Sequence, residues 1–194
     1  METFVSAAQD LKNSLRAFFR VLGEDPDRDG LKGTPDRVVR ALTEFTSGYR
    51  ADIPSFFKAV FKTDYSQMIV VRNIEFYSTC EHHLLPFSGV AHVGYIPHER
   101  VIGLSKLARL VDAFAKRLQI QEQMTVEIAN AIETFLETKG VGVVLEASHL
   151  CMRCRGAKKD HAIAVTSVLR GQFLDEPQTR AEFMTLCINH DRTH

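Results

Sequence analysis

Apolar residues recur at the spacing of an α-helix in several long stretches of the chain. In the first stretch, Leu11, Leu15 and Phe18 lie three or four positions apart, and Gly23 supplies a stop. The second stretch opens with Thr34-Pro35, and proline is favoured in the first turn of a helix. Helices are predicted over residues 7–22, 34–48, 104–118, 126–136 and 179–187.

Short runs rich in β-branched and aromatic residues predict strands between these helices. The runs are 68–71, 74–77, 89–96, 141–145 and 162–165. Two helices, strands, two helices, strands and a last helix follow one another, an order that favours the α+β class with a mainly antiparallel sheet. We expect two parts, an N-terminal helical region (1–60) and a larger α+β domain (61–194).

Composition narrows the class of protein. Of the 194 residues, 45% are hydrophobic and 25% are charged, as in a globular chain rather than a disordered one. The longest apolar runs are far shorter than the ~20 residues that cross a bilayer, so no membrane partner is expected. Lys plus Arg (24) equal Asp plus Glu (24), which leaves no net charge to attract a nucleic acid. Any anion site must therefore be a local cluster of cations.

The cysteines do not form the disulfide framework of a small secreted protein, because they are few and unevenly spaced. They stand at positions 80, 151, 154 and 187. The N-terminus carries an early acid, Glu2, and lacks the basic stretch and apolar segment of an export signal. We therefore expect a protein of the reducing cytoplasm, whose cysteines are free thiols or metal ligands.

Two clusters of cysteine and histidine carry the strongest chemical signal. In the first, Cys80-Glu81-His82-His83, a thiolate and an imidazole three residues apart can bind one Zn²⁺ from a single turn of chain. The second places His149, Cys151 and Cys154 just after a predicted strand. Two such clusters in one small chain indicate a metal site.

The number of ligands separates two interpretations of that site. If Cys154 binds with the other candidates, the site is closed and structural; if it does not, a fourth position is left for a water that the metal activates. Spacing alone leaves both open. His82 and His149 favour the second, because hydrolysis needs groups that move protons near neutral pH and a structural site does not. A partly exposed surface position is the plainer interpretation of each histidine.

A group of cations lies where the helix predicted from residue 104 begins. Ser105, Lys106 and Arg109 occupy its first turns, with the two cations on one face. Positive charge at the positive end of a helix costs roughly 0.3–1 kcal/mol, so an anion is expected there. Arg37 and Arg155 could add to such a polyphosphate pocket. Ordinary exposed helix surface is the alternative.

Gln121 and Glu122 stand just before the next predicted helix. A carboxylate can accept the two parallel N–H bonds that the N1–H and exocyclic amine of guanine offer, and an amide can pair with the neighbouring carbonyl. The helix dipole alone also favours a glutamate in a first turn. The pair is therefore a candidate, on a weak signal, for guanine recognition.

Several longer motifs, taken in order, resemble a known family. The motifs are 76–87 (FYSTCEHHLLPF), 92–97 (HVGYIP), 103–109 (GLSKLAR), 119–125 (QIQEQMT) and 149–152 (HLCM). Together they resemble GTP cyclohydrolase I of the zinc-dependent type, from about residue 34 to the C-terminus.

The resemblance implies a fold, an assembly and a reaction. The fold is the tunnelling fold, an antiparallel sheet with two helices on one face, here the catalytic domain 61–194 preceded by N-terminal helices. The assembly is a toroidal homodecamer with active sites between subunits. In the reaction, GTP and water give 7,8-dihydroneopterin triphosphate and formate, the entry step to folate or tetrahydrobiopterin.

The resemblance also implies a role for each candidate residue. Zn²⁺ would be held by Cys80, His83 and Cys151. Water activated by the metal would attack C8 of the purine, with His82 and His149 moving protons. Guanine would be recognised by Gln121 and Glu122, and the triphosphate by Arg37, Ser105, Lys106, Arg109 and Arg155.

Two positions depart from the family pattern. Cys154 could close the metal site or pair with Cys151, but Arg155 and Gly156 keep their places after it, so we interpret it as a bystander thiol. Arg170 is more polar than expected. One alternative is a related pterin or deazapurine enzyme, although neither a nucleophilic cysteine with its nitrile partner nor a three-histidine zinc site is evident. The other is a zinc-stabilised scaffold or regulatory relative with a closed Cys₃His site.

Overall fold

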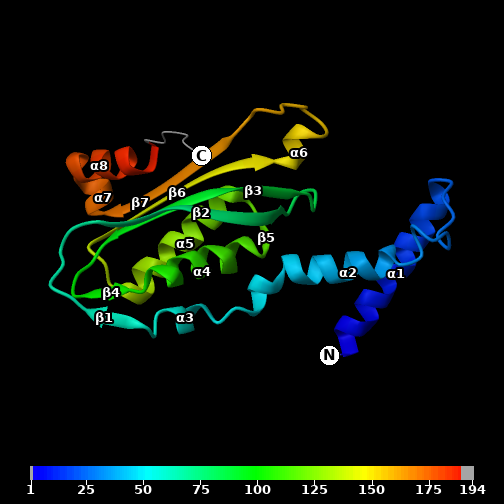
Figure 1. The fold of residues 1–194 in the computed structure, drawn as a ribbon, viewed down its shortest axis with the longest axis horizontal. Coiled ribbons are helices and arrows are strands. Elements are labelled where there is room, and N and C mark those ends of the chain that lie inside the picture. The colour runs from blue at the N-terminus through cyan, green and yellow to red at the C-terminus, as the bar shows by residue number, and fades with distance from the viewer. Residues whose placement is uncertain (1, 189–194) are drawn as a thin grey trace. The chain divides into compact units, whose positions relative to one another are not determined.

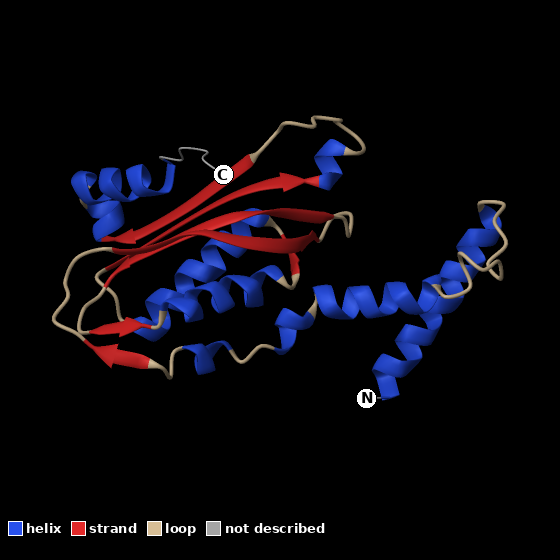
Figure 2. Cartoon of the chain, in the orientation of Figure 1, coloured by secondary structure: helices blue, strands red, loops and turns tan. Residues whose placement is uncertain are grey.

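The structure, a computed structural model, describes residues 2–188 (Figures 1 and 2). Its helices are α1 (Glu2–Val21), α2 (Thr34–Phe45), α3 (Ile53–Phe56), α4 (Leu104–Ala115), α5 (Gln121–Leu136), α6 (Leu150–Arg153), α7 (Gln172–Asp175) and α8 (Pro177–Ile188), with a 3₁₀ turn, η1 (Ser47–Arg50). Its strands are β1 (Val60–Lys62), β2 (Ile69–Cys80), β3 (Pro86–Ile96), β4 (Arg100–Ile102), β5 (Leu118–Gln119), β6 (Gly140–His149) and β7 (Ala164–Gly171). None of the helices in the described part of the chain is long and apolar enough to cross a membrane.

The chain forms two compact units, Met1–Thr46 and Ser47–His194. The first packs α1 against α2, and its ion pairs include Lys12 Nζ with Asp36 Oδ1 at 2.6 Å. Residues 47–60, which the sequence groups with the helical region, belong to the second unit. There Gly48 donates its backbone N–H to Lys116 O at 2.8 Å, so the predicted helix 34–48 ends earlier, at Phe45.

The second unit is built on a mostly antiparallel sheet. Within residues 2–188 the strand order is β5-β2-β3-β6-β7, and the β2–β5 pair is parallel. The predicted runs 68–71 and 74–77 form one strand, β2, because Asn73 adopts a left-handed conformation (φ 59°) at a bulge between Val71 and Ile74. The strand predicted at 162–165 begins two residues later, because β7 starts at Ala164.

Helices α4 and α5 cover one face of this sheet (Figure 1). Their apolar sides form the main core with the strands; its members include Leu107, Leu110, Ile128, Ile132 and Val143, each at most 1% exposed. The predicted helix 104–118 ends at Ala115, because the chain then enters β5. The α+β class, with an antiparallel sheet and two helices on one face, is confirmed.

The opposite face carries α7 and α8. These helices bury a second, smaller core of Ile96, Val144, Phe173, Phe183 and Cys187. At the same end of the sheet Arg170, which the sequence left unexplained, extends from β7 with its Nε 4.0 Å from Oε2 of Glu133 on α5.

The strand register gathers the chemical residues at one end of the sheet. β2 ends at Cys80, which pairs with Gln119 of β5, and β6 ends at His149, which pairs with Phe87 of β3. Because α5 begins at Gln121, its first turn lies at this same end.

Candidate metal centre

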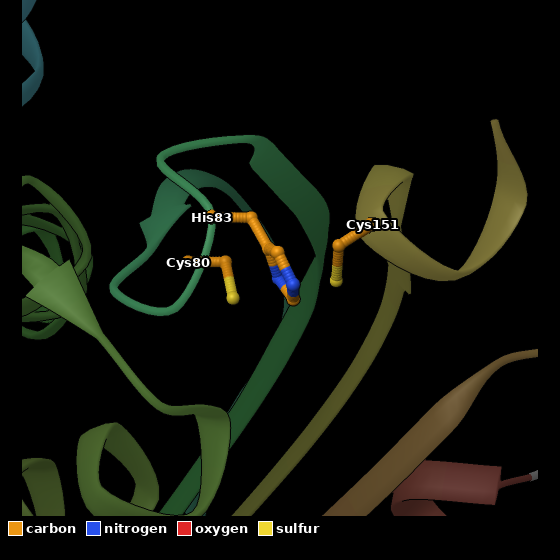
Figure 3. Close-up of side chains that lie close together, drawn as sticks. All are labelled: Cys80, His83 and Cys151. Atoms are coloured by element: carbon orange, nitrogen blue, oxygen red, sulfur yellow. The ribbon is translucent and has the colours of Figure 1, made fainter. Parts of the chain in front are cut away.

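Three side chains from the two cysteine and histidine clusters converge on one point. The ligand atoms of Cys80, His83 and Cys151 all lie within 4.8 Å of one another. Figure 3 shows the side chain of Cys80 reaching in from the end of β2, that of His83 from the loop that follows, and that of Cys151 from α6. Cys80 is buried, Cys151 is half-buried and His83 is exposed. One side of the group is therefore open.

Local backbone geometry explains how the first cluster supplies two ligands. β2 stops at Cys80, whose carbonyl accepts from Leu84 N at 2.9 Å and whose N–H donates to Leu85 O at 2.9 Å. Leu84 adopts a left-handed conformation (φ 53°) that closes this tight turn. The turn brings the side chain of His83 back beside the sulfur of Cys80.

Cys154 does not belong to the group. It lies one helical turn after Cys151, is exposed, and its Sγ donates to Leu150 O at 3.0 Å. Among the described residues, the group that could hold a metal contains two cysteines and one histidine. This arrangement corresponds to the open interpretation of the site, in which a fourth position is left to a water.

The donor set suits a borderline-soft divalent cation. Zinc bonds of about 2.0–2.3 Å to nitrogen and sulfur require ligand atoms about 3.3–3.8 Å apart, so a separation within 4.8 Å needs only a small closure. Burial raises the pKa of the Cys151 thiol, and the adjacent Cys80 sulfur raises it further. A bound cation would reverse this rise in pKa, because it stabilises both thiolates.

A hollow of about 210 Å³ opens beside the three ligands. Its lining includes Cys80, His82, Gln121, Glu122, His149 and Cys151. The exposed His82 ring lies 6.3 Å from the His83 ring, centroid to centroid. The histidines and the acid that the sequence singled out therefore surround one cavity next to the metal ligands.

His149 is held more firmly than His82. Its ring stacks on Phe87 at 4.4 Å with an interplanar angle of 5°, and its Nε2 lies 2.7 Å from Gln121 Oε1. Burial lowers the pKa of His149, an effect that the Glu122 carboxylate opposes. The imidazole is accordingly neutral near pH 7 and able to accept a proton.

Gln121 and Glu122 differ in what their side chains can reach. Glu122 is exposed and its carboxylate lines the hollow. Gln121 is 2% exposed, and its amide nitrogen lies within 3.1 Å of Leu145 O, Ala164 O and Thr166 Oγ1. Of this pair, Glu122 is therefore the residue whose side chain is available to a ligand.

The candidate phosphate ligands are spread over the chain. Ser105, Lys106 and Arg109 stand on the first turns of α4, as predicted, but the lining of the metal hollow includes no residue of α4. Arg155 lies close enough to Cys151 for its charge to lower the pKa of that thiol. Arg37 belongs to the N-terminal unit, where its Nη2 donates to Gly30 O at 3.2 Å and Thr34 Oγ1 at 3.1 Å.

Phe87 and Thr166 are parts of the site that sequence reasoning missed. Phe87 lies inside the quoted motif 76–87, but its pairing with His149 depends on the β3–β6 register. Thr166 joins the site because β7 places it opposite Leu145. An alternating strand pattern shows which residues share a face, but not which residue of the next strand lies opposite.

Comparison with known proteins finds the family that the sequence motifs resemble. The family model described as GTP cyclohydrolase I matches residues 11–188. Proteins named GTP cyclohydrolase 1 from Coxiella burnetii and Leptospira biflexa are each 50% identical over 177 residues, which is 91% of this chain and 96% and 97% of theirs. The protein of that name from Campylobacter curvus is 48% identical over 187 residues, 96% of this chain and 98% of its own.

Proposed function

The chain belongs to the GTP cyclohydrolase I family, and we propose that it hydrolyses GTP to 7,8-dihydroneopterin triphosphate and formate with the help of zinc. The convergence of Cys80, His83 and Cys151 beside a hollow with two further histidines is the observation that carries the proposal. In the cytoplasm this reaction would begin the synthesis of folate or a tetrahydropterin.

Cys80, His83 and Cys151 would hold the zinc ion. When bound, the metal supplies a Lewis acid that makes water nucleophilic near neutral pH. Cys80 and Cys151 line the hollow, which would give a purine access to the bound metal. Opening of the imidazole ring at C8 would take place there.

His149 and His82 would move the protons that ring opening and formate release require. His149 is neutral and rigidly stacked on Phe87, which suits a base that must accept a proton in a fixed direction. His82 is exposed beside the ligand His83, where it can exchange protons with solvent. Two imidazoles on one cavity can therefore act at different steps.

Glu122 would recognise guanine through the parallel N–H groups of the base. Gln121, the other candidate for this role, also lines the hollow. Its side-chain nitrogen and oxygen are both hydrogen-bonded inside the protein, so any contact with the base falls to its backbone.

The triphosphate would be held by Ser105, Lys106, Arg109, Arg155 and Arg37. Because the α4 members of this set do not line the metal hollow of their own chain, they would serve the hollow of a neighbouring subunit. A ring of such contacts closes a homo-oligomer, here proposed as a homodecamer with active sites between subunits.

The decisive experiment measures formate release and zinc content in purified protein and in Cys151→Ala. The parent is expected to hold one zinc per chain, to release formate from GTP and to yield a fluorescent pterin after oxidation. Cys151→Ala should lose the metal and at least about a thousandfold in rate, because removing the metal removes the activation of water. Cys154→Ala, which removes the exposed thiol one turn later on the chain, is the matched control and should keep both properties.

The competing hypothesis is the zinc-stabilised scaffold. Metal retained by the parent with no formate released would favour it. Loss of the metal from Cys154→Ala would do the same, because a closed Cys₃His site needs that fourth ligand.

A further inference from the structure

The side chain of Gln121 is buried in a network of hydrogen bonds between α5, β6 and β7. Its amide nitrogen lies 3.1 Å from Leu145 O, 3.0 Å from Ala164 O and 3.1 Å from Thr166 Oγ1. At 2% exposure it has almost no surface left for a ligand. The residue is therefore part of the cavity wall and not a side chain free to bind a ligand.

The network fixes which way the amide faces. Leu145 O and Ala164 O are carbonyl oxygens and can only accept, so the amide NH₂ must point at them. The amide oxygen of Gln121 is therefore the atom that faces His149 Nε2, at 2.7 Å. Exchanging the two ends of the amide would set oxygen against oxygen at two positions.

Two threonines, Thr125 on α5 and Thr166 on β7, also stabilise the first turn of α5. Thr125 Oγ1 donates to Gln121 O at 2.7 Å, and Thr166 Oγ1 lies 2.7 Å from Thr125 Oγ1. Since the Thr125 hydrogen is used on Gln121 O, Thr166 is the donor in that pair. The backbone and the side chain of Gln121 are thus both held in place.

This orientation decides where the imidazole of His149 carries its hydrogen. An amide oxygen only accepts, so Nε2 of His149 must be the N–H donor, and in the neutral ring Nδ1 is left without a hydrogen. Stacking on Phe87 sets the plane of the ring, and the bond to Gln121 sets its rotation within that plane.

We propose that Gln121 is a positioning residue whose amide oxygen accepts the Nε2–H of His149 and thereby fixes the rotation and the tautomer of that imidazole. The inference rests on the proposed function insofar as His149 moves protons, but the tautomer itself can be measured without turnover. Gln121 would then act through His149 and not through contact with GTP.

The first test observes the tautomer directly in the zinc-loaded protein. Nitrogen-15 spectra of histidine-labelled protein, with the His149 signals identified by their absence from His149→Ala, should show Nε2 as pyrrole-type and Nδ1 as pyridine-type. In Gln121→Met, which is of similar length but offers no amide oxygen, the two tautomers should become mixed. Gln123→Met, an exposed glutamine on the same helix, is the matched control and should leave the spectrum unchanged.

The second test separates positioning from a purely structural role. Gln121→Met should lower kcat about 10–100-fold with KM for GTP within about twofold, the loss typical when the partner of a functional histidine is removed. In a His149→Ala background the same substitution should cost less than about twofold, because its effect passes through the imidazole.

Three results would overturn the proposal. They are an Nδ1–H tautomer in the parent protein, an equal loss of kcat from Gln121→Met with and without His149, and a rise in KM with kcat unchanged. If Gln121→Met does not fold, as judged by zinc content and circular dichroism, the spectrum of the parent decides the question. Failure of the parent to release formate would refute the proposed function while leaving the spectral test valid.

Discussion

The cysteines illustrate how the surroundings of one residue type determine its chemistry. Cys80 and Cys151 converge with an imidazole at the end of the sheet. Cys154 is exposed on the outside of the following turn, and Cys187, on α8, is fully buried. Burial, aided by the charge of Glu146, raises the pKa of Cys187 to about 12. That thiol is therefore a core side chain and not a nucleophile.

The buried Cys187 thiol should make the protein sensitive to alkali. Its pKa is higher in the folded chain than the usual value of about 8.5, so the stabilisation is complete below that pH and is lost as the pH rises toward 12. The free energy of unfolding should fall by up to about 1.4 kcal/mol per pH unit in this window. Chemical denaturation at several pH values, with Cys187→Ala for comparison, measures the effect. Equal slopes for parent and variant would contradict it.

At the scale of elements, one aromatic side chain of α8 packs directly on the sheet. Phe183 is fully buried and packs edge-on against Phe173 at 4.9 Å. It also lies over Gly94 and Gly142, where an added Cβ would meet its ring at 2.8 Å and 2.6 Å. The two glycines of β3 and β6 thus provide the flat surface that this ring needs.

Phe183→Ala should detach α8 while leaving the metal ligands in place. Truncating a fully buried phenylalanine costs about 3–5 kcal/mol of unfolding free energy. Leu186→Ala, on the same helix but 41% exposed, should cost far less. Denaturation followed by circular dichroism gives both values, and zinc content reports on the site. An equal cost for the two variants would show that the aromatic contact is not what holds the helix.

At the scale of the whole molecule, the metal ligands and the α4 cations do not line one cavity. Arg109 lines a separate hollow of about 220 Å³ with Asp112 and Lys116. A triphosphate extending from a purine at the metal centre therefore needs cations from outside the hollow that the described residues form. A neighbouring copy of the chain is the source under the proposed function.

Mixing two inactive variants tests whether the metal ligands and the phosphate ligands of one site come from different subunits. Lys106→Ala and Cys151→Ala should each be nearly inactive alone, since one lacks a phosphate ligand and the other a metal ligand. Coexpressed in equal amounts, they should regain about a quarter of the activity per site, because some interfaces then combine two intact halves. Oligomer mass, formate release and zinc content are the measurements. Activity no greater than the average of the two variants would place both halves in one subunit.

Local sequence determined the helices, most strands and the pairing of Cys80 with His83 in the group that could hold a metal. The amphipathic stretches at 104–118 and 126–136 produce α4 and α5, with ends displaced where the chain enters β5 and where α5 starts at Gln121. The spacing of Cys80 and His83 needs only one turn of chain to bring them together. These features depend on neighbours a few residues apart, so the sequence is sufficient to predict them.

Tertiary structure decided which of the remaining candidates share the site. Spacing alone left Cys154 as a possible fourth ligand, although the residues after it indicated a bystander thiol, and the sequence offered Gln121 as a candidate for guanine recognition. In the folded chain Cys154 turns outward, and the Gln121 amide pairs with groups 24 to 45 residues away on β6 and β7. Strand register controls those contacts, and register depends on the packing of the whole sheet rather than on any local pattern.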